Sequence, residues 1–88
     1  MTPYFASVRF TRANGPEYYP ALISFTAKDF RDAGDTLFGF IAGFELSRLG
    51  TIAVEEISVN RPRGIQPPVV VGQPLNDPGL EQFLFGGK

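Results

Sequence analysis

The sequence has neither cysteine nor histidine among its 88 residues. The missing cysteines exclude disulfides, and the absence of both residue types excludes zinc sites built from Cys and His. It also excludes every Ser-His or Cys-His nucleophile, so that carboxylates and lysine remain as candidates for general acid–base chemistry. A small domain of this kind must rely on side-chain packing or on a partner for its stability.

A strong charge imbalance and a long apolar run are absent as well. The net charge is −1, so no overall field attracts nucleic acid or an anionic membrane surface. The longest uncharged apolar run, residues 36–44, is far shorter than the roughly 20 residues that span a bilayer. Met1 leads into strand-like sequence without a signal segment. We therefore expect a cytoplasmic protein with no membrane and no metal partner.

Hydrophobic residues make up 43% of the chain and include nine Phe. This is too apolar for a disordered chain, and the length suits one domain with a thin core. Prolines and glycines gather after Asn60. We predict an α+β fold with a ββαβ domain over residues 1–60 and a Pro/Gly-rich contact segment over 61–88.

The strongest turn signal is Asn14-Gly15, which separates two apolar segments at residues 4–12 and 17–25. Folding the chain there gives one wholly apolar face, and a slip of one residue would destroy it. Arg12 then lies opposite Glu17 as an ion pair. The predicted pairs are Tyr4–Phe25, Ala6–Ile23, Val8–Ala21 and Phe10–Tyr19 on the apolar face, and Phe5–Ser24, Ser7–Leu22, Arg9–Pro20 and Thr11–Tyr18 on the mixed face.

A helix is predicted after this hairpin. Thr26 with Asp29 three residues later is typical of a helix N-terminus, and Gly50 provides the stop. Pro20 lacks an N–H, which confines the second strand to a sheet edge or a bulge and makes the first strand central. A stripe at helical spacing should cover the apolar face of the sheet: Phe30, Ala33, Leu37, Phe40, Ile41 and Phe44.

Residues 51–59 are predicted to form the third strand. A bulge at Glu55-Glu56 would bring Ile52, Val54, Ile57 and Val59 to one face. A right-handed crossover then gives the strand order 2-1-3. This arrangement resembles the split half of a ferredoxin-like layer, and the resemblance implies an architecture only.

The helix carries a second apolar stripe, formed by Phe38, Ala42, Leu46 and Leu49. Gly39 and Gly43 also leave one side of the helix bare. One sheet face cannot cover both stripes, which leaves three alternatives. The chain's own C-terminal segment covers the second stripe, an oligomer or partner covers it, or it is exposed.

The C-terminal segment contains its own structural signals. Residues 69–71 suit an added edge strand. Asp77 followed by Pro78 is a helix start, so we predict short helical turns over residues 78–85 that end at Gly86. These turns carry Leu80, Phe83, Leu84 and Phe85. Apolar anchors of this kind either pack within the chain or dock on a neighbour.

No arrangement of residues predicts catalysis. Asp29, Asp32 and Asp35 lie along one face of the first helical turns, where acids favour the positive end of the helix dipole. Glu55 and Glu56 are the other acidic pair, and no phosphate-binding, dinucleotide or metal motif accompanies either group. We expect a protein that is not an enzyme and has no cofactor.

Two functions are therefore considered. The first is a small non-enzymatic protein–protein interaction or assembly component, a homo-oligomer or bound to a protein partner, of a size that suits a viral or mobile-element accessory protein. Its contacts would be Phe38, Ala42, Leu46, Leu49, Leu80, Phe83, Leu84 and Phe85. The alternative is a single-stranded nucleic-acid-binding protein that uses a mixed sheet face. Its contacts would be Phe5, Arg9, Arg12, Tyr18, Arg61 and Arg63.

Overall fold

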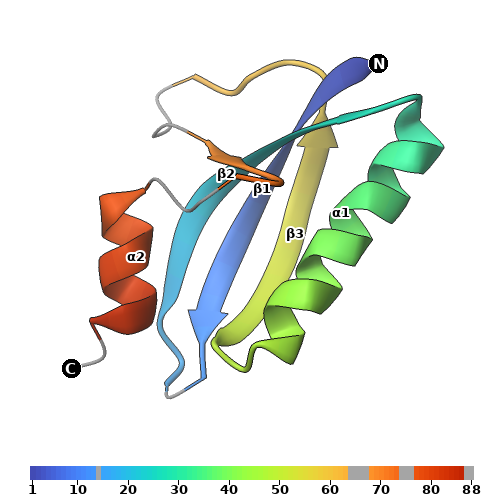
Figure 1. Ribbon diagram of the computed structural model, residues 1–88. Coiled ribbons are helices and arrows are strands. Elements are labelled where there is room, and N and C mark those ends of the chain that lie inside the picture. The colour runs from blue at the N-terminus through green and yellow to red at the C-terminus, as the bar shows by residue number, and fades with distance from the viewer. Residues whose placement is uncertain (14, 64–67, 74–76, 87–88) are drawn as a thin grey trace.

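The computed structural model describes residues 1–13, 15–63, 68–73 and 77–86. It is a small α+β structure in which a four-stranded sheet carries two helices (Figure 1). The elements in chain order are β1 (Thr2–Arg12), β2 (Tyr18–Ala27), α1 (Phe30–Leu46), β3 (Gly50–Ser58), β4 (Val69–Val70) and α2 (Pro78–Phe85).

The strands lie in the order β3-β1-β2-β4. β1 is antiparallel to β2 and β3, and β4 is parallel to β2. The predicted three-stranded order 2-1-3 and the ferredoxin-like split are therefore not matched. The difference arises because Val69 and Val70 pair with Ile23 and Ser24, which extends the sheet beyond β2. β2 is therefore not the edge strand that Pro20 predicted. Pro20 lies outside the short pairing with β4, so its missing N–H removes no bond to that strand.

The predicted hairpin register is confirmed at every pair, from Tyr4 opposite Phe25 to Thr11 opposite Tyr18. Arg12 and Glu17 form the expected salt bridge. The agreement follows from alternation, since this register makes one face of the hairpin wholly apolar or aromatic and a slip of one residue would mix it with polar side chains.

The predicted bulge in the third strand is also confirmed. Ser7 lies opposite Glu56 and Val8 opposite Val54, so Glu55 is the extra residue. The bulge brings Ile52, Val54 and Ile57 to the face of β1 that carries Phe10, whereas Val59 lies beyond the end of β3 and is exposed.

The predicted start of the helix is wrong by three residues. Thr26 belongs to β2, because the ladder with β1 continues to Ala27. Asp29 is the N-cap instead, and its carboxylate accepts a 2.9 Å hydrogen bond from the N–H of Asp32. An Asp caps as well as a Thr, so the continued strand pairing decides where the helix begins.

The predicted stop at Gly50 is wrong too. α1 ends at Leu46, and Arg48 adopts the left-handed conformation with φ of 64° that terminates many helices. Gly50 is the first residue of β3. A Cβ atom there would lie 2.0 Å from the carbonyl oxygen of Thr11, so the close approach of β1 is what requires glycine.

The core lies between one face of the sheet and the two helices. It includes aromatic and aliphatic residues of all four strands together with Ala33 and Leu37 from α1 and Leu80 from α2. Val69 and Leu80 thus join the segment after residue 60 to the same core. The division into 1–60 and 61–88 stays a prediction about domain organisation.

Candidate functional site: an apolar groove between the two helices

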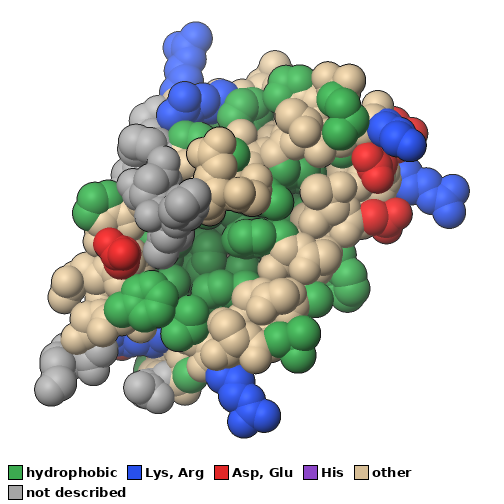
Figure 2. All heavy atoms as spheres, in the orientation of Figure 1, with side chains coloured by type: hydrophobic (Ala, Val, Ile, Leu, Met, Phe, Trp, Pro, Cys, Tyr) green, Lys and Arg blue, Asp and Glu red, His purple; other side chains and the backbone are tan. Residues whose placement is uncertain are grey.

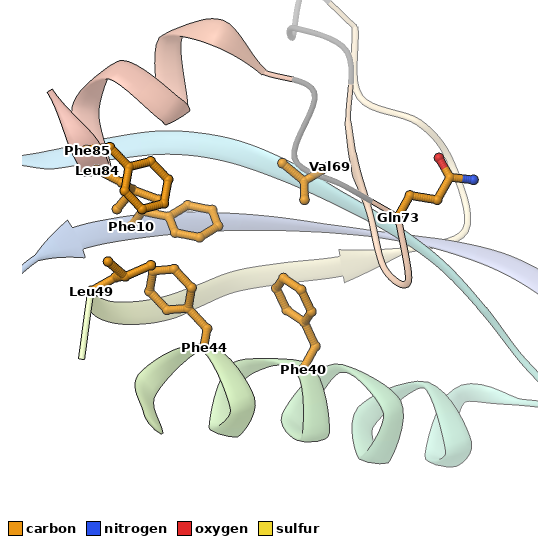
Figure 3. A pocket seen from close by; sticks show the side chains of 8 residues that line it. All are labelled: Phe10, Phe40, Phe44, Leu49, Val69, Gln73, Leu84 and Phe85. Atoms are coloured by element: carbon orange, nitrogen blue, oxygen red, sulfur yellow. The ribbon is translucent and has the colours of Figure 1, made fainter. Parts of the chain in front are cut away.

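α1 and α2 lie at opposite sides of the view in Figure 1, with strands of the sheet between them. Figure 2 shows a hollow with an apolar floor in this place. The hollow is a groove with a volume of about 230 Å³. Figure 3 shows the side chains that line it: Phe10, Phe40, Phe44, Leu49, Val69, Gln73, Leu84 and Phe85.

The wall of the groove that α1 forms and the floor that β1 forms are both aromatic. Phe10 comes from the central strand β1 and is almost fully buried, so its ring is a rigid floor. The Phe44 ring meets it edge to face, with 5.3 Å between ring centroids. Phe40 lies one turn earlier on α1 and points toward the same space (Figure 3). Edge-to-face packing holds aromatic rings in a defined geometry, so this side of the groove is preformed.

The far end of the groove is formed by β4 and the turn after it. Val69 is buried and pairs with Ile23 of β2. The N–H of Gln73 donates to the carbonyl oxygen of Val70 over 3.1 Å, and Gly72 has φ of 91°. A positive φ at the third residue defines a type II turn and favours glycine there. The turn places Gln73, the polar residue of the lining, at the end opposite Leu49 (Figure 3).

α2 forms the second wall. Its N-cap Asp77 is 6% exposed. One carboxylate oxygen accepts hydrogen bonds from the N–H groups of Gly79 and Leu80 and from the hydroxyl of Tyr19, at 3.0, 3.2 and 3.2 Å. Leu80 is completely buried. These contacts fix the start of α2 against β2.

The end of α2 is in contact with Arg12 of β1. Its guanidinium lies 4.9 Å from the ring centroid of Phe83, and Nη1 donates a 3.4 Å hydrogen bond to the carbonyl oxygen of the same residue. The Phe83 ring also packs on Tyr19, with centroids 5.8 Å apart. Leu84 and Phe85 follow directly and enter the lining.

The groove carries no charged side chain among its lining residues. Figure 2 shows Arg, Lys, Asp and Glu side chains around the rim of this face rather than over the hollow. Such a surface cannot bind phosphate or a carboxylate by ion pairing. It can bury apolar side chains, and Gln73 can orient a backbone amide.

The structure brings together some of the predicted contact residues and separates others. Leu49, Leu84 and Phe85 line the groove. Leu80 is in the core, and Phe83 is half-buried between Tyr19 and Arg12. Three residues of the second stripe face away from the sheet: Phe38 is 72% exposed, Leu46 is 82% exposed, and Ala42 is exposed as well.

α2 therefore does not cover Phe38, Ala42 and Leu46 of the second stripe, because its apolar residues pack toward β2 and the groove. The lining residues that the sequence does not mark as contact residues are Phe10, Phe40, Phe44, Val69 and Gln73. The spacing of Phe10, Phe40 and Phe44 correctly indicates an inward position for these three residues. Spacing cannot show that two helices stand too far apart to close over them.

The residues of the predicted nucleic-acid surface are divided. Arg9 pairs with Glu55 at 3.1 Å and lies 5.3 Å from the ring centroid of the exposed Tyr18. Phe5 is half-buried in β1, on the sheet face that carries Arg9. Arg12 lies on the other face, against α2. Arg61 and Arg63 follow β3 and are exposed.

No protein-family model, no curated protein and no solved structure matches this chain. Within the described ranges, no helix is long and apolar enough to cross a membrane. The described residues also contain no group of three or more acidic, His or Cys side chains that could hold a metal ion.

Proposed function

We propose that this protein is a small non-enzymatic protein–protein interaction or assembly component that binds apolar side chains of a partner in the groove between α1 and α2. The observation that carries the proposal is an open groove on a folded scaffold, lined by aromatic and aliphatic side chains and free of charge. Burying about 100 Å² of apolar surface there would contribute about 2.5 kcal/mol. A few such anchors commonly dominate the affinity of an interface.

The size of the groove indicates the kind of ligand. Its volume of about 230 Å³ is below the roughly 300–1,000 Å³ of sites that enclose a whole small molecule. One or two side chains suit it better. Helices that dock in grooves present such anchors at positions i, i+3 or i+4. We therefore propose a partner segment with neighbouring Leu or Phe anchors.

The outer surface of α1 supports the assembly part of the proposal. Phe38 and Leu46 are exposed on it together with Ala42. Large apolar side chains that share one exposed helix face are typical of contact surfaces. A protein with two separate apolar surfaces can join two partners, which is what an assembly component does.

The groove is tested by peptide selection with two matched variants. A random peptide library displayed on phage is selected against the full chain, and the recovered peptides are measured by fluorescence anisotropy. Phe85 and Phe38 are both exposed, at 57% and 72%, so Phe85→Asp and Phe38→Asp should both fold. Only Phe85 lines the groove.

We expect peptides with apolar anchors whose affinity falls at least roughly ten-fold in Phe85→Asp, because a charge then has to be desolvated. The same peptides should bind Phe38→Asp as they bind the unchanged protein. The proposal is rejected if no peptide is recovered, or if the two variants behave alike.

The alternative function, single-stranded nucleic-acid binding, is favoured by one observation. The Tyr18 ring is exposed on the open sheet face, with the Arg9 guanidinium above it. An aromatic ring beside an arginine can stack a base and neutralise a phosphate. Labelled oligothymidine should then bind at low salt, and the affinity should fall with added salt and in Tyr18→Ala. Absence of binding at low salt would eliminate this alternative.

A further inference from the structure

α2 has only eight residues, a length at which an isolated helix is marginal in water. Its position must therefore come from contacts outside the helix. The start of α2 has two strong ones, the buried Leu80 and the Asp77 carboxylate that accepts from Tyr19. The end, which carries Leu84 and Phe85 into the groove, has no fully buried side chain.

Arg12 makes a polar contact with this end from outside the helix. The last four carbonyl groups of a helix have no N–H donor inside the helix. Arg12 donates to one of them, the carbonyl oxygen of Phe83, and its guanidinium also faces the Phe83 ring. A positive charge at a helix C-terminus is favourable for the helix dipole as well.

Arg12 is itself held in place. It ends β1 and forms a salt bridge across the hairpin with Glu17. This pair is largely solvent-exposed on the Glu17 side, so it contributes little stability alone. Its effect is to restrict the guanidinium to the position from which it reaches α2.

We infer that Arg12 is a positioning residue for the groove, which holds the C-terminal turn of α2 as the second wall and thereby sets the affinity for an apolar partner. The inference rests on the proposed function for the partner, but the placement of α2 can be measured without one. Arginine suits this role better than lysine, because its planar guanidinium can stack on a ring and donate a hydrogen bond at the same time.

Arg9 is a matched control within the same strand. It also pairs with a glutamate and also faces an aromatic ring, at 5.3 Å compared with 4.9 Å for Arg12. Both of its partners, Glu55 and Tyr18, belong to the sheet. Arg9→Met and Arg12→Met therefore remove similar contacts, but only the second removes a contact with α2.

The experiment compares the full-length protein with Arg12→Met, Arg12→Lys and Arg9→Met. Amide hydrogen exchange by NMR reports on α2 and on the strands separately. Fluorescence anisotropy then gives the affinity of each variant for the peptides selected against the groove. A cation–π contact and one hydrogen bond together correspond to roughly a ten-fold effect.

We expect Arg12→Met to accelerate amide exchange in residues 82–86 about ten-fold and to weaken peptide binding by a similar factor. Exchange in β1 and β3 should stay unchanged. Arg12→Lys should recover part of both effects, and Arg9→Met should show neither.

Equal exchange of α2 in Arg12→Met and Arg9→Met would overturn the inference. So would faster exchange of α2 with unchanged peptide affinity, because the wall would then not matter for binding. If no peptide binds the unchanged protein, the proposed function and the role of Arg12 in affinity both fail, whereas the exchange data still decide whether Arg12 positions α2.

Discussion

The two helices lie on the same face of the sheet and both begin at an aspartate N-cap, yet they are attached in different ways. α1 has 17 residues and buries Ala33 and Leu37, while its N-cap Asp29 stays exposed. α2 has eight residues and buries Leu80, and its N-cap Asp77 is the buried charged residue of the described chain. A long helix can be held by its apolar stripe, whereas a short one depends on specific polar contacts.

This difference bears on the proposed function. α1 is the wall that the apolar core holds rigidly, through Phe44 on Phe10. α2 is the wall whose place depends on Tyr19, Asp77 and Arg12. Elements with few buried apolar contacts open most readily. The proposed binding of a partner in the groove should therefore order α2 more than α1.

The largest expected losses of stability come from replacing the buried leucine of each helix. Leu37→Ala should lower the free energy of unfolding by about 3 kcal/mol, which is the usual cost of a cavity in a core. Leu80→Ala should cost less, about 2 kcal/mol, because the site can collapse when the short helix moves. Urea unfolding followed by circular dichroism measures both. A greater loss in Leu80→Ala would show that α2 is the more strongly coupled helix.

A second comparison concerns the two caps. Asp77→Ala should cost about 2 kcal/mol, since it leaves the N–H of Leu80 and the hydroxyl of Tyr19 with one partner fewer in a part-buried setting. Asp29→Ala removes one exposed cap bond and should cost about 1 kcal/mol. Thermal unfolding resolves the difference between the two variants, because a change of about 1 kcal/mol shifts Tm by about 4–8 °C in a domain of this size. Equal shifts would mean that burial of the Asp77 cap adds nothing.

The smallest expected changes in the free energy of unfolding come from two glycine substitutions, and they have opposite signs. Gly43 is exposed in α1 and nothing lies within 4 Å of an added Cβ, so Gly43→Ala should stabilise the protein by about 1 kcal/mol. Gly79 in α2 is different, because a Cβ there would lie 2.4 Å from the hydroxyl oxygen of Tyr19. Gly79→Ala should therefore destabilise by about 1 kcal/mol. Chemical unfolding of both variants measures the signs, and stabilisation by Gly79→Ala would contradict the packed Tyr19 contact.

Much of the fold could be predicted from local patterns. The hairpin register, the Arg12–Glu17 ion pair and the bulge at Glu55 follow from alternation of side chains and from the turn. The short helix α2 with its Asp77 cap and its end at Gly86 is confirmed as well. These features depend on residues that are close in sequence or paired directly.

The errors occur where tertiary contacts compete with a local signal. Thr26 is a good N-cap in isolation, but pairing with Pro3 keeps it in β2. Gly50 is a good helix stop, but contact with the backbone of Thr11 is what requires it. In both cases β1 supplies the deciding contact.

The sequence by itself determined the strands, the pairing of the hairpin and the two amphipathic helices, because alternation and helical spacing are properties of short segments. Only the tertiary structure decided that α2 packs beside β2, that Phe38 and Leu46 stay exposed, and that a groove remains over Phe10. The distance between two helices depends on how all their side chains fill space together. No segment encodes that distance alone.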